Sequence, residues 1–85
     1  MANSASAMKR VRQNEKRRLR NRVVHGSYRN AVATAREAID TGSDQAAALV
    51  AEASRQLDRA VTKGVLHRST ASRRISRLAK ALANN

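Results

Sequence analysis

The sequence has no cysteine, proline, tryptophan or phenylalanine, and its one aromatic residue is Tyr28. Without cysteine, the chain has neither a disulfide framework nor a thiolate metal site. It has no apolar run long enough for a transmembrane helix, and its N-terminus lacks the apolar segment of a secretory signal. It also has no glycine-rich phosphate loop. These absences exclude a disulfide-rich secreted domain, a membrane-spanning protein and a P-loop nucleotide hydrolase.

Large apolar residues are scarce as well. The chain has 85 residues, which favours one domain, and hydrophobic residues make up 41% of it. Of these 35 residues 17 are alanine, so only 18 are larger. A short chain buries little surface, and an alanine-rich one buries less. We therefore expect a thin core.

Positive charge is abundant and unevenly distributed. The 18 lysines and arginines outnumber the 6 acidic residues and give a net charge of +12. Residues 1–36 carry +9, residues 37–62 carry −3 and residues 63–85 carry +6. Such a charge repels itself in a compact state, and its concentration at the two ends indicates a polyanionic partner or an anionic surface.

Helix-stop signals divide the chain into three segments. Gly42 and Gly64 suit the left-handed position just past a helix end, and Ser43 and Ser69 suit the N-caps of the next helices. Asp44 is then expected in the first turn, where the helix dipole favours negative charge. The absence of proline and the many alanine, arginine and leucine residues favour helix throughout. The sequence predicts helices over about residues 6–41, 44–63 and 70–83.

Apolar residues recur at helical spacing in each segment. The three stripes are Val24, Tyr28, Val32, Ala35 and Ile39; Val50, Ala53, Leu57 and Val61; and Ala71, Ile75, Leu78 and Leu82. Short connections make consecutive helices antiparallel neighbours. The expected fold is an all-α, antiparallel three-helix bundle, with alanines that let the helices approach closely. A long, basic first helix should extend beyond the bundle.

The first 22 residues differ from the bundle, residues 23–85. Their large apolar residues past Met1 are Met8, Val11 and Leu19, which form no continuous stripe, and basic residues occur almost all round. A helix that is polar on all sides has no tertiary packing to hold it. We therefore expect this basic arm to fray in the free protein and to become helical when phosphates neutralise it.

The choice of cation indicates the kind of anion. Fourteen of the eighteen basic residues are arginine, whose planar fork can donate two parallel hydrogen bonds to a phosphate. Cations on several faces of the arm suit folded RNA better than one groove of a straight DNA duplex. Single-stranded binding relies on aromatic stacking, and Tyr28 lies on the apolar stripe as a core residue. The remaining modes of RNA recognition are contacts to phosphate and ribose and recognition of RNA shape.

No constellation of catalytic or metal-binding residues is evident. His25 and His67 are the two histidines, and neither is accompanied by the further ligands that a metal site needs. His67 lies in a basic turn, where it could either pack against the bundle or contact RNA. The acidic residues suit structural roles, such as Asp58 within reach of Arg55. We expect no enzyme activity, no cofactor and no small-molecule substrate.

Two stretches resemble a known family. The first contains Met1-Ala2-Asn3, Ser6-Ala7, Lys9-Arg10 and the run from Gln13 to Arg22; the second contains Asp58, Ala60, the run from Lys63 to Ser69, Ala71, Arg73-Arg74 and Ser76-Arg77-Leu78. They resemble the bacterial small-subunit ribosomal protein S-twenty family over nearly the whole chain. The more specific part is the Lys-Gly-x-x-His turn followed by Ala-x-Arg. Ser69 stands where the family usually has asparagine.

The resemblance implies a three-helix bundle that binds 16S ribosomal RNA directly and supports RNA folding and assembly in the 30S subunit. It implies a cytoplasmic location in the ribosome, other subunit components as partners and no catalysis. The residues that match the family's basic segments are Lys9, Arg10, Lys16, Arg17, Arg18, Asn21 and Arg22 in the arm, and Lys63, His67, Arg68, Arg73, Arg74 and Arg77 in the turn and third helix. Arg12, Arg20 and Arg29 complete the set of candidate RNA contacts.

Without the family resemblance, the residues are also compatible with two other functions. A DNA-binding, nucleoid-type protein is the main alternative, although the sequence lacks a helix-turn-helix pair or a β-ribbon arm. A membrane-active or calmodulin-binding helix is suggested by residues 70–83. Such helices usually carry tryptophan or phenylalanine on the apolar face, and this one carries alanine, isoleucine and leucine.

Overall fold

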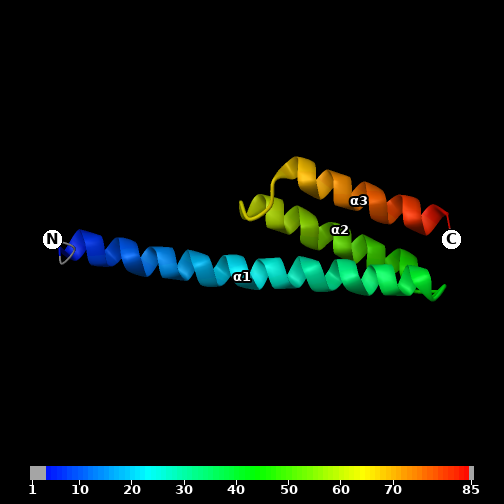
Figure 1. The fold of residues 1–85 in the computed structure, drawn as a ribbon, viewed down its shortest axis with the longest axis horizontal. Helices are drawn as coiled ribbons and strands as arrows, with labels where there is room; N and C mark the ends of the chain where they lie inside the picture. The colour runs from blue at the N-terminus through cyan, green and yellow to red at the C-terminus, as the bar shows by residue number, and fades with distance from the viewer. Residues whose placement is uncertain (1–3, 85) are drawn as a thin grey trace.

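The computed structural model describes residues 4–84, and Met1-Ala2-Asn3 of the family resemblance lie outside this range. The chain forms three helices, α1 (Ala5–Asp40), α2 (Ala46–Thr62) and α3 (Arg68–Ala83). No strand occurs within the described residues. The helices run antiparallel in succession, so that α1 and α3 point the same way (Figure 1). The described part measures 59 × 21 × 14 Å, which makes it an elongated slab.

Both helix stops lie at the expected glycines. Gly42 has φ +68° and Gly64 has φ +74°, the left-handed region that glycine enters without a steric penalty. At the end of α2, the Val65 N–H donates to the Ala60 carbonyl (2.9 Å) and the Gly64 N–H to the Val61 carbonyl (2.9 Å). These two bonds satisfy carbonyls that the helix itself leaves unpaired. The same pair of bonds closes α1 around Gly42.

The helix starts differ from the prediction. α2 begins at Ala46, two residues later than expected, because Ser43 Oγ accepts from the Gln45 N–H (3.1 Å) and holds a turn ahead of the helix. Asp44 lies in this turn and not in the first turn of α2.

Ser69 is not the N-cap of α3. His67 has an extended backbone and its Nδ1 accepts from the Ser69 N–H (3.1 Å), so the histidine ring caps a helix that begins at Arg68. Ser4 provides an N-cap for α1 that the sequence analysis did not identify, since its Oγ accepts from the Ala7 N–H (3.2 Å).

The core is thin and rich in alanine. One buried cluster, near the α1–α2 turn, contains Ala35, Ala38, Ile39, Ala46, Val50, Ala53 and Leu78. The other, near the α2–α3 turn, contains Val24, Tyr28, Leu57, Ala60 and Ala71. All three apolar stripes are buried or half-buried, as predicted. Small side chains at the contact allow the helices to pack closely.

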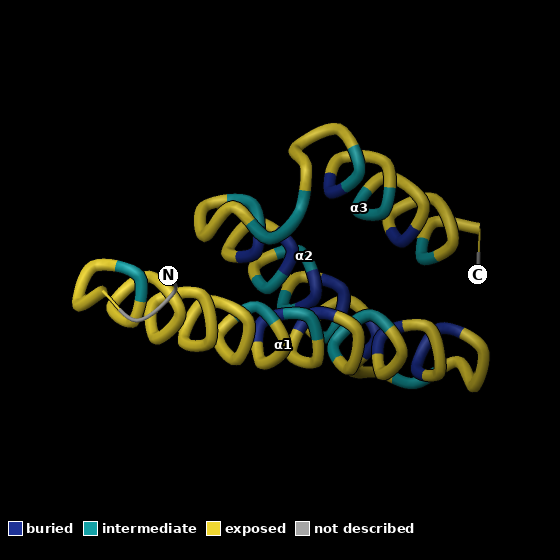
Figure 2. Tube along the Cα trace, turned by 60° about the vertical axis from the view of Figure 1, so that its left-hand side comes forward, coloured by how far each residue is buried: buried dark blue, intermediate teal, exposed yellow. Residues whose placement is uncertain are grey.

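The first helix extends well beyond the other two (Figure 1). Its first buried residue is Val24, and nearly all of the helix before that point is exposed (Figure 2). The large apolar residues of this segment, Met8, Val11, Leu19 and Val23, are 50–62% exposed. α1 is therefore a helix whose second half packs in the bundle and whose first half projects from it. No helix among residues 4–84 is both long and apolar enough to cross a membrane.

Candidate nucleic-acid interface

The projecting half of α1 carries the densest charge of the molecule. It holds eight basic residues and one acidic residue, Glu15, and all nine are exposed. The basic residues are Lys9, Arg10, Arg12, Lys16, Arg17, Arg18, Arg20 and Arg22. Since no carboxylate pairs with them in the described structure, their guanidinium and ammonium groups are available to external anions.

A shallow hollow lies where the arm meets the bundle. Its walls are successive turns of α1, which contribute Asn14, Arg17, Arg18, Asn21, Arg22 and His25. Four of these six residues belong to the candidate set from the sequence. The hollow combines arginine cations with asparagine amides, which is a donor-rich surface suited to phosphate and ribose oxygens.

Tyr28 and His25 mark the transition from arm to bundle. Tyr28 is 2% exposed, as predicted for a core ring, and its Oη lies 2.9 Å from His25 Nδ1. The Arg74 guanidinium of α3 lies over the tyrosine ring, with its Cζ 5.6 Å from the ring centroid. This contact is a cation–π interaction between α1 and α3. His25 thus has a structural hydrogen-bond partner, and Arg74, one of the candidate RNA contacts, is half-buried against the ring.

The turn between α2 and α3 presents a second group of candidates. Lys63, His67 and Arg68 are exposed there, while Val65 and Leu66 pack against the core. His67 Nδ1 lies 2.7 Å from Ser69 Oγ, and the same atom accepts a hydrogen bond from the Ser69 backbone N–H. The sequence left two roles open for His67, packing and RNA contact. The structure shows that it caps α3, and because the residue is exposed, an RNA contact is still available.

A groove between α1 and α3 unites candidates that are far apart in the sequence. It has a volume of about 370 Å³ and is lined by Arg29, Val32, Ala33, Arg36, Arg74 and Arg77. Arg36 was not in the predicted set. Its only sequence signal is a position two helical turns after Arg29, and the other arginines that line the groove with it, Arg74 and Arg77, come from α3. Arg73, the remaining candidate, is exposed on α3.

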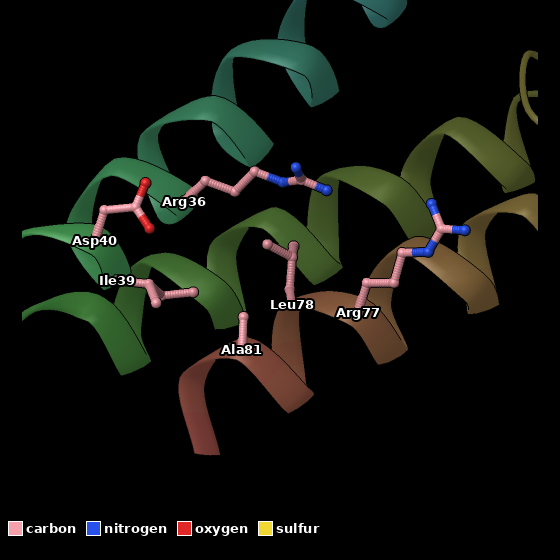
Figure 3. A pocket seen from close by; sticks show the side chains of 6 residues that line it. All are labelled: Arg36, Ile39, Asp40, Arg77, Leu78 and Ala81. Atoms are coloured by element: carbon pink, nitrogen blue, oxygen red, sulfur yellow. The ribbon is translucent and has the colours of Figure 1, made fainter. Parts of the chain in front are cut away.

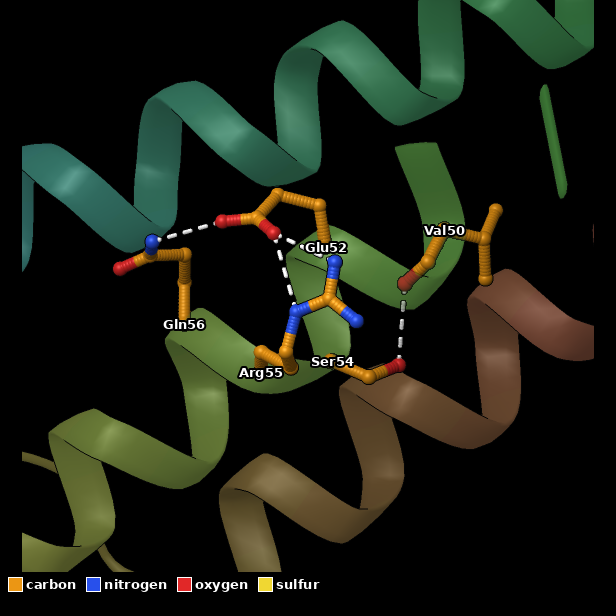
Figure 4. A network of polar contacts seen from close by, with 5 residues as sticks. All are labelled: Val50, Glu52, Ser54, Arg55 and Gln56. Atoms are coloured by element: carbon orange, nitrogen blue, oxygen red, sulfur yellow. Dashed lines mark hydrogen bonds and ion pairs between the residues drawn. The ribbon is translucent and has the colours of Figure 1, made fainter. Parts of the chain in front are cut away.

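The charges of α2 are partly compensated within the helix. Glu52 Oε2 accepts from Arg55 Nη2 (2.7 Å) and Nε (3.0 Å), while Oε1 accepts from Gln56 Nε2 (2.9 Å) (Figure 4). The hydrogen bonds from Gln56 and Arg55 hold the pKa of Glu52 below its usual value. Arg55 therefore pairs with Glu52 and not with Asp58, the partner considered from the sequence. This is the one ion pair within residues 4–84.

The described residues contain no group of three or more histidine, aspartate or glutamate side chains that could hold a metal ion. His25 bonds to a tyrosine and His67 to a serine, and neither is aligned by a carboxylate as a catalytic base would be. The chemistry that this surface offers is hydrogen-bond donation from fixed positive charges to an anionic polymer.

Comparison with known proteins gives a consistent result. The sequence matches the family model described as ribosomal protein S20 over residues 2–83. It is 54% identical over 84 residues to small ribosomal subunit protein bS20 of Anaeromyxobacter sp. (strain Fw109-5), which covers 98% of this chain and 93% of the relative. It is 51% identical over 83 residues to the protein of that name from Mycobacterium sp. (strain JLS), with 96% of both chains covered. The similarity thus extends over nearly the full length of each protein.

Proposed function

This chain belongs to the ribosomal protein S20 family, and from that premise we propose that it binds 16S ribosomal RNA directly. It is a structural component of the small ribosomal subunit, and its binding supports RNA folding and 30S assembly. It acts in the cytoplasm within the ribosome, beside other components of the subunit. The function involves no catalytic step, cofactor or small-molecule substrate.

One observation carries this proposal. A helix with eight basic residues and a single acidic residue projects from the bundle and has almost no apolar packing of its own. Such a segment has no stabilising role inside the protein, and like charges on successive turns oppose its helical form. A polyanion that surrounds the arm removes this repulsion and supplies the missing contacts.

The contacts divide into three groups of residues. The arm supplies Lys9, Arg10, Arg12, Lys16, Arg17, Arg18, Arg20, Asn21 and Arg22. The α2–α3 turn supplies Lys63, His67 and Arg68. The bundle supplies Arg29, Arg74 and Arg77 in the α1–α3 groove and the exposed Arg73 on α3. Recognition is by phosphate charge and RNA shape, because Tyr28, the single tyrosine in a sequence without tryptophan or phenylalanine, is buried.

Equilibrium binding at matched salt tests the proposal. The protein is titrated against a 16S ribosomal RNA transcript and against a DNA duplex of equal length. We expect tighter binding to the RNA, with chemical protection of a limited set of nucleotides. Preference for the plain DNA duplex would contradict the proposal and support a nucleoid-type protein instead.

The substitutions Arg17→Ala and Arg18→Ala link this binding to the arm. Both side chains are exposed on the projecting half of α1, so their loss should weaken RNA binding and leave the thermal midpoint of the bundle nearly unchanged. Thermal unfolding by circular dichroism and RNA titration measure the two effects separately. A large drop in the midpoint would show that these arginines support the fold.

A further inference from the structure

Four arginines of α1 lie in a row that crosses from the arm into the bundle. Arg18, Arg22, Arg29 and Arg36 are separated by 4, 7 and 7 residues, and all four are exposed. At about 100° per residue, they lie within an arc of roughly 40° on one side of the helix. The row is about 27 Å long at ~1.5 Å per residue. It passes without interruption over the junction between residues 22 and 23.

Two arginines of α3 form the opposite side of this row. Arg74 and Arg77 line the α1–α3 groove together with Arg29 and Arg36, while Val32 and Ala33 contribute apolar lining. A second hollow of about 250 Å³ continues the groove, since Arg36 and Arg77 line both. We call the six residues Arg18, Arg22, Arg29, Arg36, Arg74 and Arg77 the arginine track.

The direction of the helices orients the track. Side chains on an α-helix tilt toward its N-terminus. Because α1 and α3 run parallel, their arginines lean toward the same end of the groove, which is the end nearest the arm. Figure 3 shows Arg36 and Arg77 extending from the two helices in the same general direction, away from Ala81. Their guanidinium groups can therefore act on one ligand that follows the groove.

The track is short of negative charge. No ion pair within residues 4–84 involves any of its six arginines, and the single carboxylate that lines either hollow is that of Asp40. Arg74 lies over the face of the Tyr28 ring and makes no ion pair. Like charges on two facing helices repel each other, so the groove without a ligand works against the packing of α3 on α1.

We propose that the arginine track holds the phosphate backbone of a single RNA strand, which continues from the arm into the α1–α3 groove with Arg36 as one of its ligands. This inference rests on the proposed function. A phosphate backbone suits the site because each guanidinium can bind a phosphate through two parallel hydrogen bonds. Bases are not read here, since the lining between the arginines is aliphatic and the nearby Tyr28 ring is buried.

The proposal requires opposite effects on binding and on stability. Removal of two track charges takes away phosphate ligands and also relieves repulsion between the helices. Substitution of Arg36 and Arg77 by glutamine keeps much of the aliphatic stem and should weaken RNA binding about 10- to 100-fold at moderate salt, while the thermal midpoint of the free protein rises. The slope of log K against log salt should fall by about two.

A matched control is available on α2. Arg55→Gln with Arg59→Gln also removes two positive charges, at exposed positions that line neither hollow, and one of the two, Arg55, is paired with Glu52. We expect its affinity to fall less than threefold, with an unchanged salt slope. Binding of the wild type and both double variants to a 16S ribosomal RNA transcript is measured by titration at several salt concentrations, and unfolding by circular dichroism.

The outcomes separate this inference from the proposed function. If the wild type does not bind the transcript, the proposed function fails and the track fails with it. If the wild type binds but the Arg36/Arg77 variant behaves like the α2 control, the function stands and the track is refuted. A fall in the midpoint of the Arg36/Arg77 variant would assign these arginines to helix packing and would also overturn the inference.

Discussion

Tyr28 supplies the largest fully buried side chain and joins the two helices that contact each other least, α1 and α3. Its ring packs in the core, its hydroxyl bonds to His25 and its face meets the Arg74 guanidinium. Spacing along the first helix was enough to predict the burial of Tyr28. The Arg74 contact could not be predicted, because the two residues are 46 positions apart and their meeting depends on how α3 lies against α1.

Two substitutions separate the ring of Tyr28 from its hydroxyl. Tyr28→Phe keeps the packing and removes one hydrogen bond, so we expect a loss of about 0.5–1.5 kcal/mol in the free energy of unfolding. Tyr28→Ala empties the site, and truncation of a buried aromatic costs about 3–5 kcal/mol. Urea unfolding measures both. Equal losses would show that the hydroxyl and not the ring carries the stability.

Among the elements, the helix ends divide into those that the sequence determines locally and those that it does not. Gly42 and Gly64 end α1 and α2 because the left-handed turn requires a residue without a Cβ, a requirement visible in the sequence. The start of α3 was assigned to the wrong residue because His67 acts as the capping acceptor in place of Ser69. Histidine is not among the preferred N-cap residues, so no composition rule would select it.

Two glycine-to-alanine substitutions should change stability in opposite directions. Gly64 has φ +74°, where a Cβ costs about 1–2 kcal/mol, so Gly64→Ala should destabilise the protein by that amount. Gly26 lies inside α1, where alanine is favoured by about 0.5–1 kcal/mol, so Gly26→Ala should stabilise it.

At both glycines an added Cβ would meet no atom within 4 Å, which leaves the backbone conformation as the difference between them. Thermal midpoints of the two variants provide the measurement. A loss at Gly26 as large as that at Gly64 would refute this interpretation.

The arm is helical from Ala5 onward in the structure, and its fraying in the free protein stays a prediction. Arg12, Lys16 and Arg20 place like charges one turn apart, and each such pair costs a few tenths of a kcal/mol. In hydrogen exchange, amides of residues 8–20 should exchange quickly in the free protein and slowly with ribosomal RNA, while those of residues 28–39 stay protected in both. Equal protection of both segments without RNA would contradict the predicted fraying of the arm.

At the scale of the whole molecule, charge and burial are separated along the long axis. The projecting half of α1 carries charge without a core, and the rest carries a core with arginines along its α1–α3 side. The length of the first helix and its excess over the bundle followed from the positions of the helix stops. The sequence did not predict that the basic surface continues into the bundle. Arg36 belongs to that surface because it lines a groove with Arg74 and Arg77 of α3, and this neighbourhood depends on the packing of the helices.

The separation of charge predicts a strong dependence of binding on salt. If about 6–10 phosphates are contacted, affinity for ribosomal RNA should fall by ~10³–10⁵ between 50 and 200 mM salt, because bound counterions are released on association. Titrations across this range measure the slope. A flat response would show that phosphate neutralisation is not the source of affinity.

The continuity of α1 has a geometric consequence for insertions and deletions. One residue inserted near Gly26 would rotate the whole arm by about 100° about the helix axis, so that Arg18 and Arg22 would no longer share a side with Arg29 and Arg36. Seven inserted residues would nearly restore that alignment and move the arm about 10 Å farther out. Only the heptad-sized change would keep the two halves of the helix in phase.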